Sequence, residues 1–111
     1  MWTWPQGDIV LEYGQSLKIL CILNKTYIDT TFPGKNSSDL VFFRNKKEME
    51  PEYITIINET TISMYVEKPP PAEDMYYCKL RFSYKDNGAV CLNKVVIGFK
   101  PQEPQNFSCI S

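Results

Sequence analysis

The chain has 111 residues, a formal net charge of −1 and no histidine. This length suits one domain with a modest core, and the near-neutral charge argues against nucleic acid or an anionic membrane surface as a partner. Because histidine is the usual general base and the commonest metal ligand, its absence predicts no enzyme, no cofactor and no metal site.

The first half of the chain predicts four strands and almost no helix. The strongest is Ser16–Leu23, whose apolar residues alternate onto one face that we expect to be buried. In that strand the inward positions are Leu17, Ile19, Cys21 and Leu23. The other three are Leu40–Arg44, Tyr53–Ile57 and Thr61–Val66, with a short helical turn expected near Lys46–Met49.

The second half predicts two strands that follow a stiff crossover. Three prolines in Lys68–Ala72 remove three backbone donors and forbid both helix and ladder. Strands are predicted at Met75–Tyr84 and Ala89–Lys100, with a tight turn at Asp86–Gly88 between them. In the first of them, Tyr76, Cys78, Leu80 and Phe82 should point inward, and Tyr77, Lys79 and Arg81 outward; in the second, Val95, Ile97 and Phe99 share a face.

The segment Asp74-Met75-Tyr76-Tyr77-Cys78 is the most specific motif of the chain. A tyrosine two residues before a cysteine resembles strand F of immunoglobulin-like domains, where the cysteine bridges the two sheets to strand B. Cys21 is the matching upstream cysteine, and Phe43 would replace the tryptophan common on strand C. The expected fold is therefore all-β: an immunoglobulin-like antiparallel sandwich of about seven strands with a Cys21–Cys78 inter-sheet disulfide.

Cys91 and Cys109 have no evident partners in the sequence. If the strand Ala89–Lys100 continues outward, eighteen mostly extended residues at ~3.3 Å each separate these cysteines far beyond bridging distance. We therefore predict that the two do not pair with each other. Cys91 is interpreted as a buried thiol or a link to another molecule, and Cys109 as a cysteine whose mate lies outside this chain.

Four of the seven asparagines lie in N-x-S/T sequons, where chance gives about one. Together with four cysteines, this indicates a secreted or cell-surface protein in an oxidising compartment. The predicted glycosylation sites are Asn24, Asn36, Asn58 and Asn106.

The C-terminal residues Pro101–Ile110 resemble a junction found in tall class I cytokine receptors. There a proline-rich linker leads into an Asn-(Leu/Phe)-Ser-Cys strand that opens a fibronectin type III module. Thr55–Thr60 and the Leu40–Arg44 strand resemble the first domain of the interleukin-6 signal transducer. Tyr77–Leu80 with Cys91 is more similar to the interleukin-12 and interleukin-23 receptors. The resemblance implies an immunoglobulin-like domain at residues 1–100, followed at 101–111 by a linker and a truncated first strand.

In such receptors the N-terminal domain contacts a four-helix cytokine, alone or held by a second receptor chain, and completes a JAK/STAT-type signalling complex. The resemblance implies an extracellular domain of a single-pass receptor, whose membrane contact lies in a C-terminal part beyond this chain. Contact is expected through the N-terminal segment and the start of the last strand. On this sequence the implied ligand-binding residues are Trp2, Trp4, Pro5, Asp86, Asn87, Ala89, Val90 and Leu92.

Other interpretations stay open from the sequence. Two tryptophans near a terminus favour a binding surface, because tryptophan is enriched among interface hot spots. The alternative is that one of the two tryptophans packs on the edge of the domain itself. The whole chain also fits a structural or adhesive immunoglobulin domain that associates with itself, or a soluble decoy receptor. The sequons are distant from Trp2–Pro5 in sequence, which predicts a glycan-free surface there.

Overall fold

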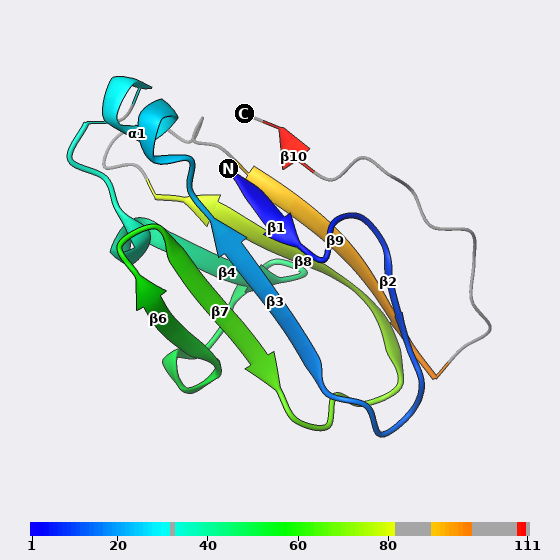
Figure 1. Ribbon diagram of the computed structural model, residues 1–111. Coiled ribbons are helices and arrows are strands. Elements are labelled where there is room, and N and C mark those ends of the chain that lie inside the picture. The colour runs from blue at the N-terminus through cyan, green and yellow to red at the C-terminus, as the bar shows by residue number, and fades with distance from the viewer. Residues whose placement is uncertain (32, 82–89, 99–108, 111) are drawn as a thin grey trace.

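The computed structural model describes residues 1–31, 33–81, 90–98 and 109–110. Two β-sheets face each other and enclose the core (Figure 1). The elements of the first half are β1 (Trp2–Trp4), β2 (Ile9–Leu11), β3 (Leu17–Ile22), helix α1 (Lys25–Thr31), the 3₁₀ turn η1 (Ser37–Asp39), β4 (Leu40–Arg44) and β5 (Lys47–Glu48). Those of the second half are the 3₁₀ turn η2 (Pro51–Tyr53), β6 (Ile54–Asn58), β7 (Thr61–Val66), β8 (Ala72–Leu80), β9 (Val90–Ile97) and β10 (Cys109–Ile110).

One sheet has four strands in the order β1-β3-β7-β6. The other has the order β10-β9-β8-β4-β5, and β2 pairs with β9. All of these pairs are antiparallel except β2–β9, which is parallel. The described residues between 2 and 97 form nine strands rather than the predicted seven or so, because β1, β2 and the two-residue β5 were not recognised in the sequence.

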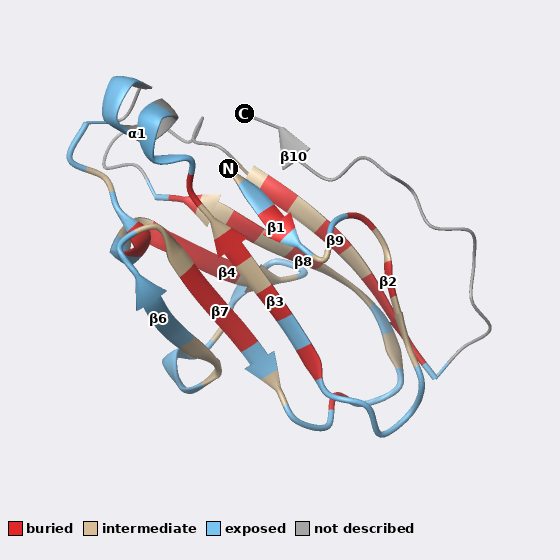
Figure 2. Ribbon diagram, viewed as in Figure 1, coloured by how far each residue is buried: buried red, intermediate tan, exposed pale blue. Residues whose placement is uncertain are grey.

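The core lies between the facing sides of the sheets, and burial alternates along β3 and β8 as the sequence pattern predicts (Figure 2). Cys21 and Cys78 form the predicted disulfide, with an S–S distance of 2.05 Å and a Cα–Cα distance of 6.4 Å. The inward positions predicted on β3, β8 and β9 are confirmed wherever the structure describes them; Phe82 and Phe99 lie outside the described residues.

On β4 the residue predicted to take the place of the strand C tryptophan, Phe43, is wrong. Phe42, not Phe43, is fully buried, and it is the register partner of Cys78. Phe43 is half-buried opposite Tyr77 on the outer side of the sheet. The sequence could not decide this point because Leu40, Val41, Phe42 and Phe43 form an unbroken apolar run, in which period-two alternation is not visible.

Two local predictions are corrected by tertiary pairing. The turn expected near Lys46–Met49 is the β4–β5 hairpin, in which Phe43 pairs with Glu48. Helix α1, a seven-residue element, was not predicted, because so short a segment shows no clear helical period. Strand β8 also begins at Ala72 instead of Met75, since Ala72 is the first residue after the prolines and finds a partner in Ile97 of β9.

The C-terminal strand β10 pairs antiparallel with the start of β9, so that Cys109 lies opposite Cys91 in the register. Cys91 is fully buried and is disulfide-bonded, not a thiol. The prediction that Cys91 and Cys109 are too far apart to pair is therefore wrong, because residues 109–110 run back along β9 instead of extending it. The boundary near residue 101 lies outside the described residues and stays a prediction. In the described part of the chain, no helix is long and apolar enough to cross a bilayer.

Candidate functional site

The exposed apolar residues of β1 lie on the outer face of the four-stranded sheet. Trp2 is 38% and Trp4 is 62% exposed, whereas Thr3 between them is fully buried. Trp2 is the register partner of Ile22, and Trp4 of Leu20, both on β3. Directly opposed side chains on antiparallel strands are ~5 Å apart at Cβ, so these four residues form one continuous apolar surface. We call this surface, Trp2, Trp4, Leu20 and Ile22, the tryptophan patch.

The segment that follows β1 is fixed by a buried amide. The Asn93 side chain on β9 donates from Nδ2 to the carbonyl oxygens of Pro5 at 2.9 Å and Gly7 at 2.8 Å. The chain crosses here from one sheet to the other, with a cis Trp4–Pro5 peptide and a positive φ of 72° at Gly7. Because Asn93 supplies two donors to a crossing segment, the edge strand β1 has a defined position beside β9.

The remaining predicted ligand-binding residues are not on the tryptophan patch. Along β9 the inward residues Cys91, Asn93 and Val95 alternate with Val90 and Leu92, which therefore face outward from the six-stranded sheet. Asp86, Asn87 and Ala89 lie outside the described residues. The predicted residues of β1 and β9 thus lie near the same edge of the sandwich but on opposite outer faces. Trp2 and Trp4 face outward from the four-stranded sheet, whereas Val90 and Leu92 face outward from the six-stranded sheet. A flat partner cannot cover both groups.

Leu92 instead belongs to a row on the outer face of the six-stranded sheet. Tyr77 is the register partner of Leu92 on β9 and of Phe43 on β4, and all three side chains are half-buried. The sequence stripe of Tyr77, Lys79 and Arg81 indicated one strand of this face. Its neighbours could not be found from the sequence, because they depend on the register of three strands.

Three sequons gather at one end of the sandwich. Ser37 of the Asn36 sequon donates from its backbone to Glu59 and from its hydroxyl to the Asn58 carbonyl, both within 2.8 Å. Lys25, next to Asn24, forms an ion pair with Glu59 at 2.6 Å. Asn24, Asn36 and Asn58 are all exposed, and Asn106 lies outside the described residues.

The tryptophan patch lies closer to this end than the sequence separation indicates. Trp2 pairs with Ile22, Ile22 with Thr61, and Thr61 with Asn58, so that one row crosses the whole sheet. Four adjacent strands spaced ~4.8 Å apart place Asn58 about 14 Å from Trp2. The side-chain oxygens of both Asn36 and Asn58 accept from the hydroxyl two residues later, Ser38 and Thr60 respectively.

The charges around this end are paired and exposed. The hydrogen bond and attraction between Lys25 and Glu59 raise the pKa of Lys25 and lower the pKa of Glu59. Partial burial lowers the pKa of the Met1 amino group, beside Trp2. Within the described ranges, no group of three or more His, Cys, Asp or Glu residues could hold a metal ion.

No protein-family model matches this chain, and no curated protein matches it in sequence. Solved structures do match in fold. A chimeric titin Z1Z2–Z1Z2 tandem carrying a fibronectin GRGDS peptide superposes with a TM-score of 0.59 at 10% identity, over 86% of this chain and 45% of that chain. An immunoglobulin complex of titin M10 with obscurin-like 1 gives 0.58 at 12% identity, over 91% and 95%. Titin M3 gives 0.54 at 10%, over 86% and 93%.

The fold is that of an immunoglobulin-like domain. Two packed sheets, the Cys21–Cys78 bridge and these structural neighbours agree on it. At these identities the similarity extends to the fold alone. This immunoglobulin-like domain carries the apolar tryptophan patch on one outer face and the row of Phe43, Tyr77 and Leu92 on the other.

Proposed function

We propose that this immunoglobulin-like domain is the extracellular recognition domain of a cytokine receptor, and that it contacts a four-helix cytokine through the tryptophan patch. The observation that carries the proposal is the pairing of Trp2 with Ile22 and of Trp4 with Leu20 on one outer sheet face. An amphipathic helix offers an apolar stripe that matches a flat apolar patch of this kind. The sequons and disulfides support an extracellular location.

The patch has the features of an interface core. Trp4 is 62% exposed on an edge strand, and tryptophan contributes more binding energy per residue than most side chains when it becomes buried. Thr3 anchors β1 from inside and Asn93 fixes the segment behind it, so little ordering is needed on binding. Full signalling would use a second receptor chain and a membrane-spanning part of the receptor.

Binding of the 111-residue chain to a panel of helical cytokines, alone and with their first receptors, tests the proposal. We expect Trp4→Ala to weaken binding by at least tenfold, or about 1.4 kcal/mol. Tyr13→Ala is the matched control, because Tyr13 is a 74% exposed aromatic that lies outside the patch. Binding that survives both Trp2→Ala and Trp4→Ala within about 0.5 kcal/mol would contradict the proposal.

Sedimentation of the same variants separates the adhesive alternative. An adhesive domain would dimerise at micromolar concentration and would bind no cytokine. The Trp4→Ala variant of such a domain would sediment as a monomer. A soluble decoy would bind as the receptor does and would be distinguished by the absence of signalling from the full-length protein.

A further inference from the structure

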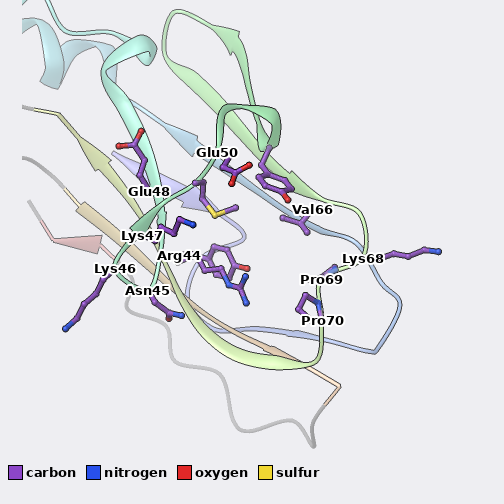
Figure 3. Close-up of a pocket in the computed structure, with 13 residues that line it drawn as sticks. Arg44, Asn45, Lys46, Lys47, Glu48, Glu50, Val66, Lys68, Pro69 and Pro70 are labelled. Carbon is purple, nitrogen blue, oxygen red and sulfur yellow. The ribbon is translucent and has the colours of Figure 1, made fainter.

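A hollow lies at the opposite end of β7 from the sequons. It has a volume of about 640 Å³ and opens between the β4–β5 hairpin with η2 on one side and the Pro69–Pro70 segment on the other (Figure 3). Strand β7 runs from Thr61, next to the Asn58 sequon, to Val66 in the wall of the hollow. The six residues of β7, at ~3.3 Å each, separate the groove from that sequon by roughly 17 Å.

The inner surface of the groove is apolar and belongs partly to the core. Met49, Tyr53 and Val66 are partly buried and pack against the core cluster, and Tyr76 forms the floor with 3% of its surface exposed. Pro69 and Pro70 form the facing wall. Since these side chains are held by the core or by proline rings, the shape of the groove is largely formed before any ligand arrives.

Arg44 presents a fixed cation at the edge of this apolar surface. The Asp74 side chain is 13% exposed, and its Oδ2 atom accepts two hydrogen bonds from Arg44, one from Nε at 3.2 Å and one from Nη2 at 3.0 Å. Its Oδ1 atom accepts from Asn45 Nδ2 at 2.9 Å. One edge of the guanidinium is thereby occupied, while 42% of the Arg44 side chain remains exposed, and Arg44 is among the residues that line the groove. A guanidinium oriented in this way can bind two oxygens of a carboxylate or of a sulfate group.

Arg44 and Lys47 are the two basic side chains of the lining that remain available to an anion in the groove. Four basic and two acidic side chains line it. Of the two acids, Glu48 is paired with Arg81 at 3.3 Å, and Glu50 lies at the Tyr53 side beside Glu52. Among the described residues Lys47 has no ion pair, and its side chain extends toward the hollow, whereas Lys46 and Lys68 extend away from it (Figure 3).

We propose that this groove binds an acidic peptide segment of a partner protein, with an aromatic side chain of the peptide on the apolar wall and a neighbouring carboxylate or sulfate between Arg44 and Lys47. Arg44 and Lys47 favour an anion between them, and the Tyr53, Tyr76 and proline surfaces favour a flat ring. Glu50 repels an anion from the opposite rim, so the peptide binds in one orientation. This site does not depend on the tryptophan patch and lies on another part of the domain.

Fluorescence polarisation with an acidic pentapeptide that carries a central tyrosine tests the site. We expect measurable binding that weakens with added salt, because exposed charges are screened over about 10 Å at 0.1 M salt. Two matched peptides, one with amides in place of the acids and one with glycine in place of the tyrosine, should each bind at least tenfold more weakly. No binding of the acidic peptide at about 1 mM would overturn the proposal.

Charge reversal locates the site. Lys47→Glu should weaken binding of the acidic peptide by about tenfold or more, because it replaces attraction by repulsion at the mouth of the groove. Lys18→Glu makes the same change in net charge at an exposed position on the outer face of the other sheet, and it should leave binding within twofold. Equal losses in both variants would mean non-specific attraction and would refute the site.

Methyl NMR gives a readout that does not depend on either variant. On addition of the acidic peptide, the methyl signals of Met49 and Val66 should shift, while those of Leu20 and Ile22 on the tryptophan patch should not. Shifts confined to the patch would overturn the groove assignment and leave the proposed cytokine surface intact.

Discussion

Asn93 and Pro5 are joined across 88 residues by a 2.9 Å hydrogen bond from the Asn93 amide to the Pro5 carbonyl. Asn93 is only 1% exposed and makes a second bond to Gly7 at 2.8 Å. This amide is the polar link between β9 and the segment that carries the two tryptophans, and it fixes where the tryptophan patch lies.

Replacing Asn93 with alanine should lower the free energy of unfolding by about 2–3 kcal/mol, because a buried and a part-buried carbonyl group lose their donor. Asn93→Asp should behave alike, since it keeps the shape but cannot donate when ionised. Chemical denaturation measures the total loss. Hydrogen exchange should show protection falling more in the β1–β3 ladder than in β6–β7, and an equal loss in both ladders would contradict this role of Asn93.

The Thr3 hydroxyl is fully buried, and its Oγ1 atom has no hydrogen-bond partner among the residues that the structure describes. Thr3→Val keeps the volume and removes the unpaired hydroxyl, so we expect the domain to gain about 1 kcal/mol of stability. Thr3→Ser is the control: it keeps the hydroxyl, loses a buried methyl group and should destabilise. If Thr3→Val lowers the denaturation midpoint, the hydroxyl has a partner in solution.

Burial raises the pKa of the Tyr76 phenol above its ordinary value of 10.0, with Arg44 opposing and Asp74 reinforcing the shift. The unfolded chain then releases this proton first as the pH rises past about 10, so stability is complete below that pH and falls above it. The slope reaches at most about 1.4 kcal/mol per pH unit for one group.

The raised pKa values of Lys25 and Lys94 act in the same alkaline direction, so the Tyr76 contribution is measured by difference. Unfolding curves of the parent and of Tyr76→Phe between pH 8 and 11 should diverge above about pH 10, with the variant declining less steeply. Parallel curves would show that Tyr76 ionises as easily in the folded state as in the unfolded one.

Cysteine mapping should find two disulfides in the chain. Cys21–Cys78 closes a loop with a sequence separation of 57, and removing it by replacing both cysteines with alanine should cost about 4 kcal/mol in the chain-entropy model. Cys91 is disulfide-bonded, and Cys109, its register partner, is the one cysteine left once Cys21 and Cys78 are paired. Proteolytic digestion without reduction should therefore release two peptides joined by a Cys91–Cys109 disulfide. Cys91 recovered with an intermolecular partner would contradict that expectation.

Strong alternation made much of the scaffold predictable. The strands around Cys21 and Cys78 were found because each has every second residue apolar, and their shared disulfide follows from a motif with a fixed spacing. Strand β1 was missed because Trp2-Thr3-Trp4 has a polar residue inward and aromatic residues outward, the reverse of the usual pattern. The choice of Phe43 over Phe42 failed for a similar reason, since an apolar run does not reveal its buried face.

The sequence by itself determined the two-sheet fold, the bridge through its core and the presence of four sequons, because these depend on local alternation and on motifs of fixed spacing. Only the tertiary structure decided which surfaces those residues form. It set Trp2 and Trp4 beside Leu20 and Ile22, turned Leu92 to the opposite face, and brought Cys109 back to Cys91. Register and chain reversal depend on pairing between segments tens of residues apart, and no local pattern records that pairing.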